Sequence, residues 1–183
     1  AVGNQLQIFE DRPIYFDAWD IDPDFEDRMW HAEPAESVEV IESGGLRAVL
    51  RIRRRVSHSV VTQDVTLHAH SARLDFVTTI DWRERHMLLK AAFPVSVNPP
   101  QASYHIQWGI VQRPAHDNTS WEAAKREVAM HYAADLSDAY YGVSLLSDCK
   151  YGCDVRDGVM RLTLLKAPGH PDPDADSGTH HFT

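Results

Sequence analysis

The chain has 183 residues, of which 43% are hydrophobic, and a formal net charge of −9 at pH 7. At this length one domain with a sizeable core is expected, because folding hides roughly 70% of the surface that the unfolded chain exposes. The negative charge argues against nucleic acid and against anionic membrane surfaces as partners, since both would repel the protein. No apolar run approaches the ~18 residues of a membrane-spanning helix, so we expect no membrane partner.

The first segment, 1–35, predicts an irregular arm. Its prolines interrupt regular structure, and one short helical turn is expected over 22–28. The segment is dense in aromatic residues, namely Tyr15, Phe16, Trp19, Phe25 and Trp30. These side chains either pack on the rest of the domain or form an interface to another domain, because aromatic rings bury a large area in both cases.

From Val38 onward, apolar and polar residues alternate with the period of two that is typical of half-buried antiparallel strands. The run 87–97 is apolar on both faces and predicts a central strand, which Pro99 and Pro100 end. Asp157-Gly158 is typical of a hairpin turn with positive φ. The remaining predicted strands cover 46–53, 61–69, 74–81, 104–110, 126–132, 143–146 and 159–165.

Many short strands at regular spacing predict an all-β protein, either a sandwich or a barrel. We expect a single β-sandwich domain over 1–183. Within it, 1–35 is the irregular arm, 36–167 holds the sandwich strands, and 168–183 is an acidic tail with a truncated last strand. Trp82 and Trp108 are both expected on inward strand faces.

The two cysteines, Cys149 and Cys153, are too few for a disulfide scaffold and lack the spacing of a CxxC motif or of a zinc quartet. No secretory signal peptide is recognisable. Free thiols and the missing signal predict a cytoplasmic protein. Lys150 next to Cys149 could lower the pKa of that thiol, but no base is placed for nucleophilic work, and a structural thiol is expected.

Five sequence blocks resemble, in order and spacing, the C-terminal region of the glycoside hydrolase family 38 α-mannosidases, closest to the cytosolic-type and bacterial members. The blocks are NQLQIFEDRPIYFDAWDID at 4–22, DWRERHMLLKAAF at 81–93, the segment 113–121, YGVSLLSDCKYG at 141–152, and the run 159–165 followed by PDPDADSG at 171–178. The resemblance implies a galactose-mutarotase-like supersandwich of two antiparallel sheets. One departure is Tyr132, which follows His131 where the family usually has a basic residue.

The resemblance implies that most of the catalytic groups lie outside this chain. Family members remove α-linked mannose with retention through an aspartate nucleophile, and a zinc ion grips the sugar hydroxyls. In the family both belong to an N-terminal barrel, which no block here resembles. We therefore expect a domain that is inactive alone, has no cofactor of its own, and braces the catalytic and linker domains of one parent chain. Zinc is expected in the missing catalytic domain, and lining of the mannose pocket is a possible additional role.

One polar loop is the first candidate for contact with a sugar at the pocket rim. Asp148, Lys150 and Tyr151 supply a carboxylate, an ammonium and a phenol within four residues. Such groups can hydrogen-bond hydroxyls and stack on a sugar ring. The structural alternative is a salt-bridged turn that buries Tyr151.

The second candidate loop carries His116 and Asn118. Its structural alternative is a loop that Trp121 anchors in the core. No catalytic residue and no metal ligand is assigned in the chain. The pair His68 and His70 shares a strand face, but that face is otherwise polar, and no third ligand is placed by the sequence.

Two other functions stay open. A stand-alone mutarotase-like carbohydrate-binding module would need exposed aromatic side chains, for which Trp82 and Trp108 are candidates despite their predicted inward faces. An independent mutarotase or lyase would use a histidine and a glutamate as acid and base. His105 and Glu127 are available by residue type.

Overall fold

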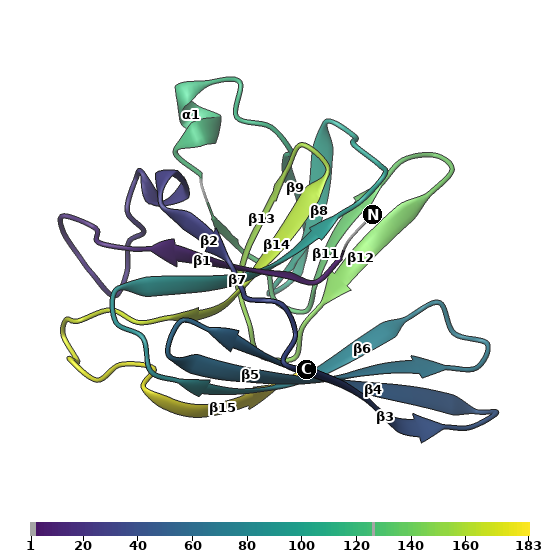
Figure 1. The fold of residues 1–183 in the computed structure, drawn as a ribbon. Helices are drawn as coiled ribbons and strands as arrows, with labels where there is room; N and C mark the ends of the chain where they lie inside the picture. The colour runs from purple at the N-terminus through teal and green to yellow at the C-terminus, as the bar shows by residue number, and fades with distance from the viewer. Residues whose placement is uncertain (1–2, 126) are drawn as a thin grey trace. The chain divides into compact units, whose positions relative to one another are not determined.

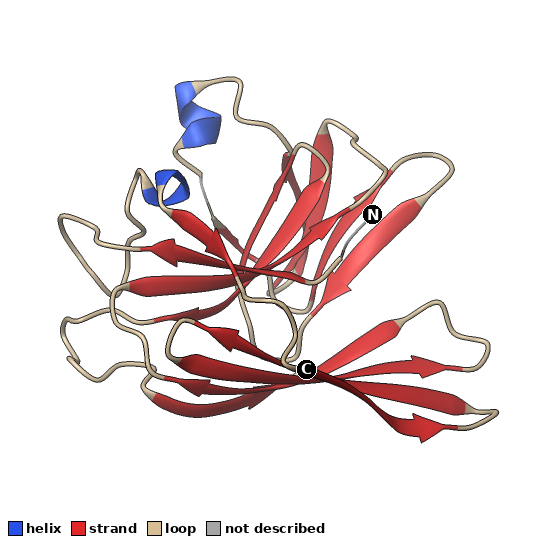
Figure 2. Ribbon diagram, viewed as in Figure 1, coloured by secondary structure: helices blue, strands red, loops and turns tan. Residues whose placement is uncertain are grey.

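The computed structural model describes residues 3–125 and 127–183. The chain divides into two compact units: unit 1 is Ala1–Gln7 with Leu89–Leu165, and unit 2 is Ile8–Leu88 with Lys166–Thr183. Nearly all regular structure is β-strand (Figures 1 and 2). Three strands, β1 (Gln5–Glu10), β7 (Met87–Pro94) and β14 (Val159–Lys166), have residues in both units.

Unit 2 contains a five-stranded antiparallel sheet in the order β15-β6-β5-β4-β3. Its strands are β3 (Ser37–Ser43), β4 (Arg47–Val56), β5 (Ser59–His68), β6 (Leu74–Trp82) and β15 (Gly178–Phe182). Leu50 pairs with Val65, and Val65 pairs with Phe76, so apolar side chains form a row across one face. The strands predicted over 46–53, 61–69 and 74–81 are therefore confirmed, but the expected burial of their apolar face is not complete, since Leu50, Leu67 and Leu74 are 41%, 48% and 52% exposed.

The N-terminal segment is more regular than the predicted arm. It contains part of β1, the 3-10 helix η1 (Phe25–Asp27) and β2 (Met29–His31), which lies beside β1. The helical turn predicted over 22–28 is confirmed by η1. Phe25 is fully buried against Phe9, with ring centroids 5.0 Å apart, and Leu88 completes this small core. The other aromatic side chains of the arm are exposed, namely Tyr15, Phe16, Trp19 and Trp30.

Unit 1 contains a four-stranded antiparallel sheet in the order β12-β11-β8-β9. The strands are β8 (Gln101–Ile106), β9 (Gly109–Pro114), β11 (Ala133–Ser137) and β12 (Gly142–Leu146). The unit also holds most of β7, which lies between β14 and β1, and β13, which lies between β10 and β14. The bounds are β10 (Val128–Ala129), β13 (Gly152–Arg156) and β14 (Val159–Lys166).

The all-β, antiparallel prediction is confirmed, and hydrogen bonding divides the strands into three sheets, where two were expected. β7 lies inside a sheet and is buried along most of its length, as the apolar run predicted. Asp157 and Gly158 have φ values of 48° and 74°, which confirms the predicted turn. The predicted division of a single domain into an arm (1–35), sandwich strands (36–167) and a tail (168–183) stays a prediction.

The prediction of one inward-facing strand over 104–110 is wrong. β8 ends at Ile106 and β9 begins at Gly109, and these two residues pair across the hairpin. Trp108 lies in the turn between them and is 99% exposed, whereas Trp82 is fully buried as expected. This turn could not be recognised from the sequence, because apolar residues alternate through it with an unchanged period of two.

Candidate functional site

The first candidate loop connects β12 to β13 in unit 1. The Ser147 hydroxyl accepts a hydrogen bond from the Lys150 backbone N–H at 3.0 Å, which closes the turn. Burial, followed by a hydrogen bond and negative charge from Asp148, raises the pKa of the Cys149 thiol. The charge of Lys150 lowers the pKa of this thiol but is the weakest of these effects, so the net direction is the one expected of a structural thiol. Tyr151 is not buried by the loop, since 53% of it is exposed.

Tyr151 belongs to a group of rings, which we call the histidine–tyrosine surface: His105, His131, Tyr132 and Tyr151. The ring centroids of His131 and Tyr151 are 5.7 Å apart, and those of His105 and Tyr132 are 5.4 Å apart. The His131 backbone N–H donates to the His105 carbonyl at 2.8 Å, which holds two of the contributing segments together. Tyr132 is 61% exposed. Exposed phenol rings beside imidazoles can stack on a sugar ring and hydrogen-bond its hydroxyls.

The second candidate loop connects β9 to the short helix α1 (Ser120–Ala123). His116 Nδ1 lies 3.3 Å from Glu122 Oε2, and Asn118 is exposed. Thr119 and Glu122 form a capping box at the start of α1. Trp121 is exposed and does not anchor the loop in the core, so that expectation is wrong. The loop is held instead by its own capping interactions.

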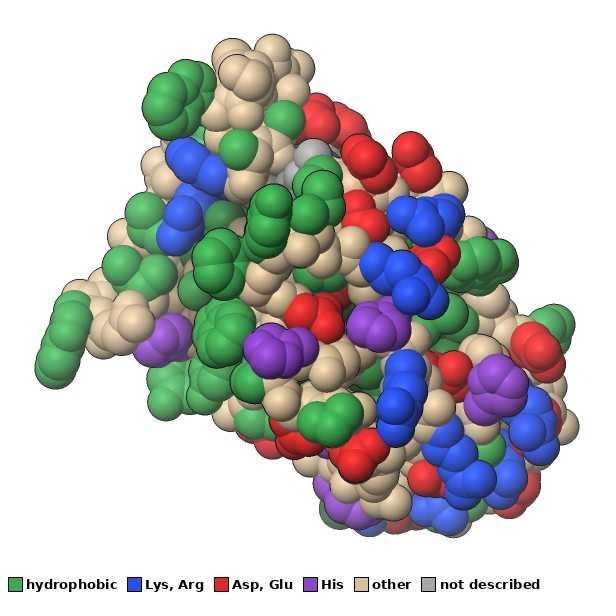
Figure 3. Space-filling model, turned by 90° about the vertical axis from the view of Figure 1, so that its left-hand side faces the viewer, with side chains coloured by type: hydrophobic (Ala, Val, Ile, Leu, Met, Phe, Trp, Pro, Cys, Tyr) green, Lys and Arg blue, Asp and Glu red, His purple; other side chains and the backbone are tan. Residues whose placement is uncertain are grey.

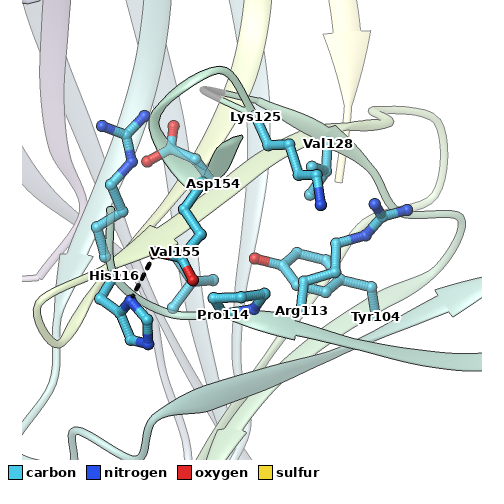
Figure 4. Close-up of a pocket in the computed structure, with 10 residues that line it drawn as sticks. Tyr104, Arg113, Pro114, His116, Lys125, Val128, Asp154 and Val155 are labelled. Carbon is cyan, nitrogen blue, oxygen red and sulfur yellow. Dashed lines mark ion pairs between the residues drawn. The ribbon is translucent and has the colours of Figure 1, made fainter. Parts of the chain in front are cut away.

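His116 lines a small pocket in unit 1 (Figure 4), to which the first candidate loop contributes no residue. The pocket is lined by Tyr104, Arg113, Pro114, His116, Glu122, Lys125, Val128, Asp154, Val155 and Arg156. Its volume is about 20 Å³. A water-sized group needs roughly 10–15 Å³, so the pocket accepts one small polar group and cannot enclose a sugar ring.

A buried ionic cluster is formed by side chains of β7, β13 and β14 together with Glu127, which directly precedes β10. Lys90 is fully buried, and its Nζ lies 2.5 Å from Glu127 Oε2 and 2.8 Å from Asp154 Oδ2. Arg161 Nε contacts the other Asp154 oxygen at 2.6 Å, and the Thr163 hydroxyl donates to Glu127. Burial alone would lower the pKa of Lys90, but the two carboxylates outweigh it, and the pKa is raised. The cluster therefore holds Lys90 in its charged form.

The pairing needed for an independent mutarotase is not formed. Glu127 is engaged by Lys90 and Thr163. His105 contacts Tyr132 and His131 through its ring. Across the described residues, 3–125 and 127–183, no hydrogen bond or ion pair joins His105 to Glu127. The geometry therefore does not support acid–base chemistry by this pair.

Gly152 leaves room for the Glu127 carboxylate of the ionic cluster, so replacing this glycine tests the cluster. A Cβ at Gly152 would lie 2.2 Å from Glu127 Oε1, an overlap that Glu127 cannot relieve without loosening its contacts with Lys90 and Thr163. Gly152→Ala is expected to lower the free energy of unfolding by about 1–3 kcal/mol, measured by urea denaturation. Gly109→Ala is the control, since a Cβ there meets nothing within 4 Å. Equal losses in the two variants would contradict this explanation.

In the part of the chain that the structure describes, no cluster of three or more His, Cys, Asp or Glu side chains is placed to hold a metal ion. His68 is exposed, and His70 follows it in a turn with a φ of 61°. The described helices are all too short to cross a membrane.

Comparison with known proteins identifies the family. The profile described as "Glycosyl hydrolases family 38 C-terminal domain" matches residues 1–174. The protein named Alpha-mannosidase 2C1 of Homo sapiens is 44% identical over 185 residues, which cover 100% of this chain and 18% of that protein. Alpha-mannosidase G of Dictyostelium discoideum is 38% identical over 100% of this chain and 17% of its own length. The chain thus spans less than a fifth of these curated relatives.

A solved structure has the same fold. The crystal structure of an alpha-mannosidase from Enterococcus faecalis V583 superposes with a TM-score of 0.80, covering 98% of this chain and 25% of that one. Its sequence identity of 15% makes this a likeness of fold alone. The profile match and the 44% identity over the whole chain carry the assignment. The chain belongs to the glycosyl hydrolases family 38 C-terminal domain family.

Proposed function

We propose that this chain acts as the C-terminal β-domain of a larger, cytoplasmic α-mannosidase that cleaves α-mannosidic bonds with retention. The observation that carries the proposal is the family match over 1–174, together with the 18% of its relative's length that the chain spans. The nucleophile and the zinc site are assigned to the rest of that parent protein. The chain's own tasks are to brace the catalytic and linker domains and to contribute to the sugar site.

The bracing role is supported by exposed apolar side chains on the N-terminal segment of unit 2. Ile14, Tyr15, Phe16 and Trp19 are each more than 70% exposed. Figure 3 shows that hydrophobic side chains are exposed on the surface of the molecule. Contiguous exposed apolar surface marks contact sites for other protein parts. We assign this segment to contact with another domain of the parent chain.

The sugar-binding role is supported by the histidine–tyrosine surface in unit 1. Tyr132 and Tyr151 offer exposed rings, and His105 and His131 place nitrogen atoms beside them. Asp148 and Lys150 lie in the loop that ends at Tyr151 and add charged hydrogen-bonding groups. Of the second candidate loop, Asn118 remains a proposed rim residue. His116 faces Glu122 in the small pocket and is the weaker candidate.

The test is a titration of the isotopically labelled chain with mannose and an α-mannobiose, followed by amide chemical shifts. Saturable shifts are expected at 131–132 and 148–152. Tyr151→Ala is expected to weaken binding by about tenfold, a change of ~1.4 kcal/mol. Tyr140→Ala is the matched control, because Tyr140 is an exposed tyrosine of the same unit.

The outcomes separate the two roles. If no resonance shifts at high millimolar sugar, the sugar-binding role is contradicted and the domain only braces its partners. If galactose binds as tightly as mannose, the stand-alone carbohydrate-binding module is favoured over the mannosidase rim. The stand-alone module is considered as a second candidate function because the rings of this surface are exposed. Turnover of an α-mannoside by this chain alone would contradict its non-catalytic assignment.

A further inference from the structure

The small pocket of unit 1 carries more positive than negative charge. Arg113, Lys125 and Arg156 line it together with two carboxylates, Glu122 and Asp154. Asp154 is already neutralised, since Lys90 lies 2.8 Å and Arg161 2.6 Å from its oxygens. Glu122 accepts the Thr119 backbone N–H in the capping box. Arg156 is partly compensated by Asp117, whose Oδ2 lies 3.8 Å from its Nη1, so Arg113 and Lys125 are the cations that attract a further negative group to the pocket.

One buried donor atom in the pocket wall, Nε of Arg113, lacks a hydrogen-bond partner among the described residues, 3–125 and 127–183. His116 Nδ1, by contrast, lies 3.3 Å from Glu122 Oε2. A buried donor without a partner destabilises a fold, so such an atom usually has a hydrogen-bonding group beside it. The Arg113 guanidinium lies 5.9 Å from the centre of the Tyr104 ring, which fixes its place in the wall. In Figure 4, Lys125 and Tyr104 direct their polar ends into the space between these side chains.

We propose that this pocket binds a single carboxylate group, with Arg113 and Lys125 as its principal partners. Arginine presents a planar fork of donors that matches a carboxylate, and such charge-assisted hydrogen bonds are about twice as strong as neutral ones. The volume of about 20 Å³ accepts the head of a carboxylate and excludes a larger acid that enters whole. The carboxylate belongs either to an acidic side chain of a protein segment that enters from outside or to a small free acid. The inference stands independently of the proposed mannosidase function.

The experiment titrates the labelled 183-residue chain at constant ionic strength with two probes. One probe is acetate, and the other is N-acetyl-glutamic acid α-methylamide, a glutamate with both backbone ends blocked. The readout is the side-chain Nε–H resonance of Arg113 and the amide resonances of 113–116. Both probes are expected to give saturable shifts. Arg113→Gln is expected to weaken binding at least about tenfold, as loss of a charge-assisted pair implies.

Two further variants serve as a control and as a second test of the site. Arg83→Gln removes the same charge from an exposed site in unit 2 and should leave both titrations unchanged. If Arg113→Gln fails to fold by circular dichroism, Lys125→Gln decides, because Lys125 is exposed and its loss should weaken binding several-fold. Blocked glutamate binding about tenfold tighter than acetate would support a protein side chain as the ligand. Equal or weaker binding would support a small free acid.

The proposal is overturned if neither probe gives a saturable shift at Arg113. It is also overturned if binding persists unchanged in the folded variants Arg113→Gln and Lys125→Gln. A shift that increases linearly and equally in the Arg83→Gln, Lys125→Gln and unmodified chains would be a general salt effect and would also reject the site.

Discussion

Replacing Lys90 by methionine is expected to lower the free energy of unfolding by about 3–5 kcal/mol, because removal of one partner leaves buried charges uncompensated. Lys90 is fully buried between Glu127 and Asp154, and Asp154 is only 3% exposed. Arg161 still pairs with Asp154, but among the described residues Glu127 would keep the hydroxyl of Thr163 as its side-chain partner. Methionine fills a similar volume, so the loss reports charge rather than a cavity.

Urea denaturation of the Lys90→Met variant measures this effect. Lys125→Met is the matched control, since Lys125 is exposed, and a surface substitution usually stays within about 0.5 kcal/mol. Adding Glu127→Gln to Lys90→Met should recover part of the lost stability by removing one unpaired charge. An unchanged midpoint for Lys90→Met, or no recovery in the double variant, would contradict the account of the ionic cluster.

Replacing Trp82 by alanine is expected to lower the free energy of unfolding by about 3–5 kcal/mol, because truncating a buried Trp leaves a cavity in addition to the lost burial. Trp82 is fully buried at the end of β6. Its indole nitrogen has no hydrogen-bond partner in the described part of the chain, so the effect comes from packing. Trp108→Ala should change stability by less than about 0.5 kcal/mol, because its side chain is 99% exposed.

The two tryptophan variants are compared by thermal and urea unfolding under the same conditions. The strand pattern of the sequence placed both residues inward, so similar losses would favour that pattern over the structure. A loss confined to Trp82→Ala would confirm the hairpin turn at Trp108. Trp82→Phe should lie between the two, since it keeps most of the buried ring area.

The sequence predicted well wherever one local pattern decides the outcome. Alternation with a period of two located β4, β5 and β6, since each strand has one face to bury. The apolar run at 87–97 correctly indicated an interior strand. Asp157-Gly158 marked its turn because positive φ strongly favours these residues. The pattern failed at β11 (Ala133–Ser137), whose small and polar residues resemble a loop.

The candidate site was only partly visible in the sequence. Tyr151 was recognised from its loop, but its ring neighbours His131 and His105 lie about 20 and 46 residues earlier in the chain. His131 and Tyr132 stood out only as a departure from the family pattern. The pocket around Arg113 gave no signal, because its lining comes from five separate segments. Contacts between distant segments depend on strand pairing, which local periodicity does not report.

By itself, the sequence determined the all-β class, most strand positions and the family, because local alternation and ordered motif blocks are properties of neighbouring residues. Only the tertiary structure decided which strands pair and which carboxylates surround Lys90. It also decided whether Trp108 is buried and which rings gather around Tyr151. The physical reason is that a side chain's burial and partners are set by the strands that pack beside it, and these are distant in the sequence.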